Sequence, residues 1–153
     1  MKEEGKGKVV LPPVNQVGIV VKDLEKTIQF HSLTLGIGPF KIREFKLEGA
    51  MLRGKPTNVK MRVALAQAGQ VQIELIQVLD GESLHTEFLR DKGEGLHHLG
   101  FIVDDIDNKL AQLAKQGIKP VFNVDLPGVS AAYLDSDKIG GVIIELIQLK
   151  GKA

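Results

Sequence analysis

The chain has 153 residues, of which 43% are hydrophobic and 25% charged, and its formal net charge is +1. This composition is typical of a globular protein that buries its own core, and the near-neutral charge argues against nucleic acid or an anionic membrane as a partner. Because the chain contains no cysteine, disulfides, thiolate metal sites and a cysteine nucleophile are excluded.

Residues 1–13 begin with several lysines and end at Pro12-Pro13. We expect this segment to be a flexible N-terminal tail. It lacks the apolar run of a signal peptide, and no stretch of the chain approaches the roughly 20 apolar residues of a membrane span. A cytoplasmic location is therefore the default expectation.

Residues 14–79 are predicted to form a β-α-β-β-β module. The apolar run at 14–21 is typical of a strand, and Asp23 is a candidate cap for a helix that continues to Leu35. Further along the module we expect an edge strand at 40–47, a mobile loop at 48–58 and a hairpin of strands at 59–67 and 70–79.

Residues 80–95 are predicted to be a linking helix and loop, and residues 96–149 a second module of the same kind. Asp105 is the candidate cap of its helix, which Gly117 ends. The expected strands are 96–103, 119–123, 130–134 and 141–149. We predict one compact α+β domain over 14–149, in which paired βαβββ modules form a curved mixed sheet around a metal-binding cleft.

An internal repeat is the strongest signal in the sequence. Residues 71–77 read Val-Gln-Ile-Glu-Leu-Ile-Gln and residues 142–148 read Val-Ile-Ile-Glu-Leu-Ile-Gln, while residues 16–24 similarly match 98–106. Each module thus opens with a strand that carries a polar residue and closes with a strand that carries a glutamate. Four polar side chains at equivalent places in two modules are what a metal site on a pseudo-twofold axis requires.

At these residues the pattern resembles the vicinal oxygen chelate superfamily, which includes glyoxalase I, methylmalonyl-CoA epimerase, extradiol dioxygenases and antibiotic-resistance binding proteins. The stretches 93–101 (Gly-Glu-Gly-Leu-His-His-Leu-Gly-Phe), 103–105 and 140–146 are similar to the epimerase branch, and 35–40 is similar to a glyoxalase-like subgroup. The resemblance implies a homodimer and a bound divalent metal ion. Carried over position by position, the metal ligands are Gln16, Glu74, His98 and Glu145.

The chemistry of these residues supports the same set. Strand alternation places Gln16 with Gly18 on one face, and His98 with Gly100, so that the glycines leave room beside a metal. A glutamate between apolar neighbours is costly to bury unless it is paired or bound to metal. One nitrogen and three oxygens, two of them from carboxylates, suit an octahedral Mn, Co, Ni, Mg or Zn ion.

Simpler interpretations compete for each residue. Either glutamate alone would more often face solvent, and His98 alone would more often be a core histidine, but their repetition favours the metal site. His97 is expected to point to the opposite face of its strand in a structural role. His31 and His85 are predicted to lie on helices without a catalytic role.

The sequence departs from the epimerase pattern at three places. Epimerases usually carry histidine where this chain has Gln16, and glutamine or another residue where it has Glu74. The set found here resembles one glyoxalase I type instead. Near the second carboxylate base of epimerases, the chain offers Met61, Arg62 and Val63, and Glu44 or Glu48 would need a different path.

We predict an enzyme that removes a proton α to a carbonyl or thioester, with Glu145 as the base and Glu74 on the opposite face. The preferred substrate is an acyl-CoA such as methylmalonyl-CoA, and a thiol conjugate (a hemithioacetal, as in glyoxalase I) comes second. Substrate specificity is assigned to the loops at 48–58 and 126–130. A non-catalytic small-molecule binder is the alternative, and a ring-cleaving dioxygenase ranks last because it needs two histidines on iron.

Overall fold

The repeat folds as two four-stranded sheets joined edge to edge, in a computed structural model that describes residues 7–138 and 140–151. The strand order β1-β4-β3-β2-β6-β7-β8-β5 closes on itself as a barrel. The strands are β1 (Gln16–Val20), β2 (Lys41–Leu52), β3 (Lys55–Ala68), β4 (Val71–Asp80), β5 (Gly95–Ile102), β6 (Pro120–Leu126), β7 (Val129–Leu134) and β8 (Ile143–Leu149). The predicted α+β fold, with paired modules in a curved mixed sheet, is confirmed.

The two modules have the same register around their opening strands. β1 runs parallel to β4 and places Gly18 opposite Glu74, just as β5 runs parallel to β8 and places Gly100 opposite Glu145. β1 and β5 are antiparallel neighbours, with Gly18 opposite His98. In the same ladder, Gln16 lies opposite Gly100. Each opening-strand glycine therefore lies beside the polar residue of the other module.

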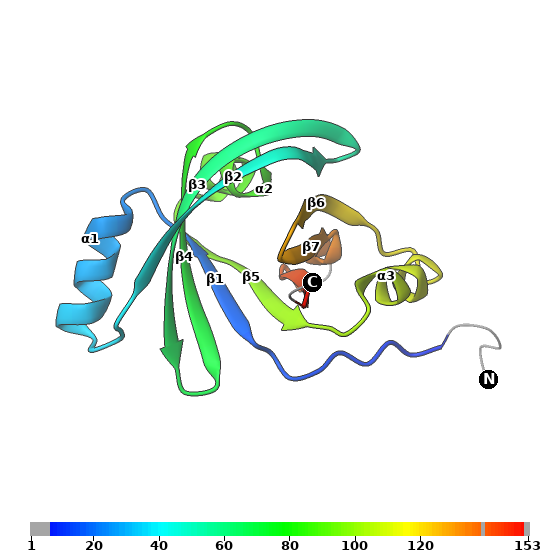
Figure 1. Ribbon diagram of the computed structural model, residues 1–153, viewed down its shortest axis with the longest axis horizontal. Helices are drawn as coiled ribbons and strands as arrows, with labels where there is room; N and C mark the ends of the chain where they lie inside the picture. Colours follow the sequence, from blue (N-terminus) through cyan, green and yellow to red (C-terminus); the bar gives the residue numbers. More distant parts are fainter. Residues whose placement is uncertain (1–6, 139, 152–153) are drawn as a thin grey trace.

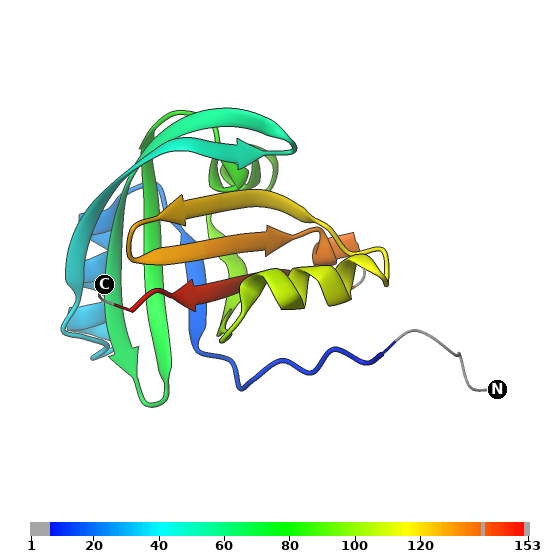
Figure 2. The ribbon, with the colours of Figure 1, turned by 45° about the vertical axis from the view of Figure 1, so that its right-hand side comes forward.

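The helices cover the outside and one end of the barrel (Figure 1). Helix α1 (Leu24–Gln29) lies outside the first sheet, and α3 (Ile106–Ala114) lies across the outer face of the second sheet, as Figure 2 shows. Helix α2 (Leu84–Lys92) contributes Leu84 to the interior core and so covers one end of the barrel.

Two equivalent helix starts explain part of the repeat. The predicted caps are confirmed, because Asp23 and Asp105 each accept a hydrogen bond from the backbone three residues ahead, at 3.0 Å. In each module, the glutamine that ends the repeated motif also accepts a hydrogen bond from the first residue of that module's helix. Gln77 accepts from the Leu24 amide at 3.0 Å, and Gln148 accepts from the Ile106 amide at 2.9 Å.

The interior core is shared by both sheets and forms the walls around the candidate site. Its buried members are Leu47, Ala50, Val59, Met61, Val63, Ile76, Leu84, Phe122, Tyr133 and Ile143. Separate outer clusters hold the helices: one packs α1 through Leu24 on Ala64 and Leu75, and another packs α3 through Ile106 on Leu146.

The predicted mobile loop at 48–58 is wrong. β2 continues to Leu52 and β3 begins at Lys55, so most of this segment is a long hairpin. Gly49 lies at a register shift between Leu47 and Ala50, with a φ of 69°, and Gly54 makes the turn with a φ of 80°. The glycines that suggested a loop therefore serve a bulge and a tight turn.

The first predicted helical segment reaches Thr34, close to the expected end at Leu35, but its type changes part-way. α1 ends at Gln29, and a π-helical turn, Phe30–Thr34, continues it. His31 lies in that turn beside the rings of Phe30 and Phe40.

The described part of the N-terminal segment runs along α3. Gln116 donates a hydrogen bond to the Gly7 carbonyl at 2.7 Å, and Leu11 packs on the outer cluster beside α3. The prediction for residues 1–6 lies outside the described residues. Among the described helices, none is long and apolar enough to cross a membrane.

Candidate metal centre

Three of the four predicted ligands lie around one atom of the fourth, the Nε2 of His98. This nitrogen is 3.2 Å from Gln16 Oε1, 3.4 Å from Glu74 Oε1 and 3.5 Å from Glu145 Oε2. The side chains come from β1, β4, β5 and β8, which are the opening and closing strands of the two modules. The repeat thus brings one imidazole nitrogen, one amide oxygen and two carboxylates to a single point.

Neighbouring residues fix the direction of these donor atoms. The Gln16 amide nitrogen donates to Gln72 Oε1 at 2.9 Å, which turns the Gln16 oxygen toward His98. The His98 ring lies over Gly18, where a methyl group would overlap it. Because His98 is 0% exposed and Glu145 4% exposed, both groups are held with little contact with solvent.

Burial and mutual charge shift the pKa values in this group. Burial lowers the pKa of His98, but the carboxylates of Glu145 and Glu74 outweigh burial and leave the pKa raised. Burial raises the pKa of Glu145 to about 7; His98 opposes this rise and Glu74 adds to it. The titrations of the two groups are therefore linked, and the pKa of Glu145 lies near the pH at which proton transfer is efficient.

One atom of the site lacks a partner that a cation would supply. Glu145 Oε2 is buried and, within the described part of the chain, accepts no hydrogen bond. A buried carboxylate oxygen without a partner is energetically unfavourable. A divalent ion among the four donor atoms would contact this oxygen, so the residues present fit such an ion.

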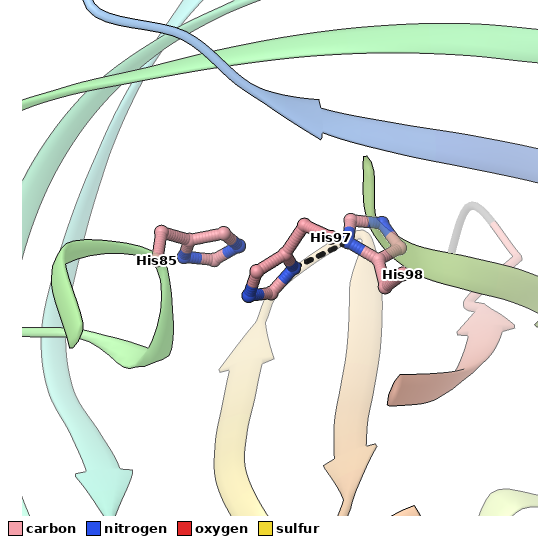
Figure 3. Close-up of side chains that lie close together, drawn as sticks. All are labelled: His85, His97 and His98. Carbon is pink, nitrogen blue, oxygen red and sulfur yellow. Dashed lines mark hydrogen bonds between the residues drawn. The ribbon is translucent and has the colours of Figure 1, made fainter. Parts of the chain in front are cut away.

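A cluster of three histidines lies on the other side of the His98 ring (Figure 3). His97 Nδ1 and His98 Nδ1 are 2.9 Å apart and share one hydrogen. The His85 ring, from α2, stacks on His97 with a centroid distance of 4.6 Å. All three side chains are buried.

The expectation that His97 points away from His98 is wrong. β1 and β5 shift register here, since Gly18 is opposite His98 whereas Ile19 is opposite Leu96. His97 is therefore the extra residue of a β-bulge, which breaks strand alternation and lets both rings face the interior. The hydrophobic periodicity of the sequence does not predict this bulge.

The histidine cluster is itself able to hold a metal ion, since one nitrogen of each ring lies within 4.8 Å of the others. It competes poorly with the four-residue set, for two reasons. The His85 nitrogens already contact Ser83 and Tyr133, both at 3.3 Å. The cluster also lacks a carboxylate to balance a divalent charge in a buried place.

An apolar cavity of about 100 Å³ adjoins the site. Its polar lining residues are Glu74, His85 and Tyr133, and the other described lining residues are Phe45, Leu47, Met61, Val63, Ile76, Phe122, Val124, Leu126 and Ala131. Tyr133 lies beside Glu145 on the neighbouring strand. The sequence reasoning missed Tyr133, although it is the chain's single tyrosine.

The residues considered for a second base lie elsewhere. Arg62 points outward and pairs with Glu25 at 2.8 Å, and Glu44 and Glu48 are exposed. Met61 and Val63 do line the cavity, but without a titratable group. Among the described lining residues Glu74 is the carboxylate that faces the cavity.

Residues 15–133 match the model of the Glyoxalase/Bleomycin resistance/Dioxygenase superfamily. The chain therefore belongs to this superfamily, in agreement with its paired modules and with the polar residues at equivalent strand positions.

Three relatives illustrate the range within the superfamily. The chain is 29% identical to the uncharacterized protein YqjC of Bacillus subtilis over 141 residues, which is 90% of this chain and 93% of that protein. It is 27% identical to mouse mitochondrial methylmalonyl-CoA epimerase over 139 residues, which is 88% of this chain and 72% of the epimerase. The structure of a methylmalonyl-CoA epimerase in complex with methylmalonyl-CoA and NH4+ superposes with a TM-score of 0.73 at 22% identity, covering 93% and 97% of the chains.

Proposed function

We propose that this protein is a divalent-metal-dependent isomerase or epimerase that removes and returns a proton α to a thioester carbonyl. The observation that carries the proposal is the convergence of Gln16, Glu74 and Glu145 oxygens on His98 Nε2, beside an apolar cavity. Proton transfer at carbon needs a base with a pKa near the working pH and a stabilised negative charge on the substrate. The carboxylates support the role of the base, and a cation held by the four residues would stabilise the negative charge.

A bound divalent cation would act as a Lewis acid that polarises the substrate carbonyl and stabilises the charge developing on its oxygen. Gln16, Glu74, His98 and Glu145 would hold it. Glu145 takes the proton and returns it. Glu74 faces the cavity from the other module, so it is the proposed base for the opposite face of the α-carbon.

The cavity lining favours the acyl part of a thioester as its occupant. Among the described lining residues there is no lysine or arginine, and nine of the twelve are apolar. Such walls would leave charged groups unpaired, so the charged parts of glutathione or of CoA must lie outside the cavity. A related structure holds methylmalonyl-CoA, which supports an acyl-CoA as the substrate class here.

A glyoxalase I-like lyase is the second candidate, favoured by one specific observation. Glu74 lies 3.4 Å from His98 Nε2, so the site presents two carboxylates, the set that resembles one glyoxalase I type. A hemithioacetal would then be the substrate. A non-catalytic binder of the same fold is the outcome to be excluded by experiment.

Metal affinity should rise with pH. Glu145 has a pKa of about 7 in the metal-free protein, so below about pH 7 a proton occupies this carboxylate, and the raised pKa of His98 also favours a proton on its ring. A divalent ion must displace them, which makes affinity increase by up to about tenfold per pH unit for each proton released. Calorimetric titration with Mn²⁺ at about pH 6 and about pH 8 measures this. A dissociation constant that does not change with pH would contradict the proposed ligands.

Solvent exchange tests the reaction. The purified protein, reconstituted with Co²⁺ or Mn²⁺, is incubated in deuterium oxide with methylmalonyl-CoA and, separately, with the methylglyoxal–glutathione adduct. We expect deuterium at the α-carbon of methylmalonyl-CoA and slower reaction of the adduct. A binder would exchange neither, and faster turnover of the adduct would favour the lyase.

The Glu74→Gln variant tests the opposite-face base in the same assay. Two bases label chiefly the product enantiomer, whereas one base labels one face and returns some original proton. We expect Glu74→Gln to abolish labelling of the product enantiomer while exchange on the Glu145 face continues. Stereospecific exchange that survives unchanged would assign a one-base isomerase.

A further inference from the structure

A chain of three buried residues leads from the start of α2 to Glu145. Ser83 Oγ is 3.3 Å from His85 Nδ1, and His85 Nε2 is 3.3 Å from the Tyr133 hydroxyl. Tyr133 lies opposite Glu145 in the antiparallel β7–β8 ladder, so the two side chains are neighbours on one face of the sheet. Ser83 is 0% exposed and His85 is 1% exposed, so these contacts are shielded from water.

The direction of the first contact follows from the helix cap. Ser83 Oγ already accepts a hydrogen bond from the Thr86 amide at 3.3 Å, and the Ser83 amide donates to Thr86 Oγ1 at 2.8 Å. Of the two described partners of Ser83 Oγ, the Thr86 amide only donates, so His85 Nδ1 is the one able to accept the hydroxyl hydrogen. Leaving a buried hydroxyl hydrogen without an acceptor is unfavourable, so Ser83 donates and His85 Nδ1 accepts.

The direction of the remaining contacts follows from the first contact. Because His85 Nδ1 accepts from Ser83, it carries no hydrogen, and the buried ring is neutral with one hydrogen. With Nδ1 accepting, that hydrogen is on Nε2 and is donated to the Tyr133 oxygen. The Tyr133 hydrogen is then directed away from His85, and the neighbouring side chain across the β7–β8 ladder is Glu145.

We propose that Ser83, His85 and Tyr133 form a one-way hydrogen-bond chain that delivers the Tyr133 hydroxyl as a neutral donor to Glu145. Tyr133 is a positioning residue: by holding the Glu145 carboxylate, it fixes the orientation from which Glu145 exchanges a proton with the substrate. The catalytic consequence rests on the proposed function, whereas the direction of the chain does not.

The histidine tautomer tests the direction without any substrate. Nitrogen-15 NMR of the Zn²⁺-loaded protein, which has four histidines, should show His85 with its hydrogen on Nε2. In Ser83→Ala, we expect the His85 tautomer with its hydrogen on Nδ1 to become populated as well. Thr86→Val is the matched control, because it removes the other half of the helix cap but leaves the Ser83 hydroxyl in place. A wild-type His85 with its hydrogen on Nδ1 would overturn the proposal.

Tyr133→Phe tests the consequence, because it removes the hydroxyl and keeps the ring that packs on Phe122 and His98. We expect kcat for deuterium exchange into methylmalonyl-CoA to fall about 10- to 100-fold, with KM and Co²⁺ affinity nearly unchanged. An unchanged kcat, or a loss of Co²⁺ affinity equal to the loss of kcat, would overturn the positioning role. If the wild-type protein exchanges no α-hydrogen of methylmalonyl-CoA, the proposed function fails. The His85 tautomer then tests the direction of the hydrogen-bond chain on its own.

Discussion

Replacement of Glu145 by glutamine is expected to lower turnover by about two to four orders of magnitude while the fold and much of the metal binding remain. The amide of Glu145→Gln keeps an oxygen that is able to face the ion, but it does not accept the substrate proton. Glutamine has nearly the same shape, and the buried position loses a charge rather than volume. The measurement is kcat for α-hydrogen exchange, together with metal content and the free energy of unfolding.

The control for Glu145→Gln is its counterpart in the repeat, Glu74→Gln, which changes the same group at the equivalent strand position. We expect the two variants to bind metal to a similar extent and to differ in which face of the substrate exchanges. A near-normal rate for Glu145→Gln would show that the base is elsewhere, with Glu74 the next candidate.

Replacement of Gly18 by alanine is expected to lower the free energy of unfolding by about 1–3 kcal/mol and to weaken metal binding. The added methyl group would overlap the His98 imidazole. The ring has little freedom to move away, because His97 hydrogen-bonds its Nδ1 and Tyr133 packs on it with a centroid distance of 5.1 Å. Displacing it turns Nε2 away from Gln16, Glu74 and Glu145.

Gly128→Ala is the control for Gly18→Ala, because a methyl group there meets nothing within 4 Å and the backbone lies outside the left-handed region. Its free energy of unfolding should stay within about 0.5 kcal/mol of the wild-type value. Chemical denaturation and Co²⁺ titration measure both variants. Wild-type stability and Co²⁺ affinity in Gly18→Ala would contradict the position of the His98 ring.

The sequence predicted the parts of the fold that depend on local pattern and on repetition. Asp23 and Asp105 were identified as caps because a short acidic side chain before an apolar helix has one common role. Gln16 and His98 were placed in register because the repeat aligns them, and a repeat folds into equivalent positions in both modules. Strand alternation then brought them to one face with the glutamates.

The parts that sequence reasoning missed depend on a local break in regularity or on contacts between distant segments. His97 faces the interior because of a bulge in β5. His85 meets Tyr133 across 48 residues of sequence, and nothing near either residue predicts the other. The glutamines Gln77 and Gln148 were visible in the repeat, but their hydrogen bonds to the helix starts need the packed sheet and helix together.

The location of a bound metal ion tests the central claim most directly. Crystals of the protein grown with Mn²⁺ allow the ion to be placed by its anomalous scattering. We predict one ion bound by Gln16, Glu74, His98 Nε2 and Glu145, at about 2.0–2.3 Å from the ligand atoms. An ion held by the nitrogens of His85, His97 and His98, or a site that stays empty at saturating Mn²⁺, would contradict the account.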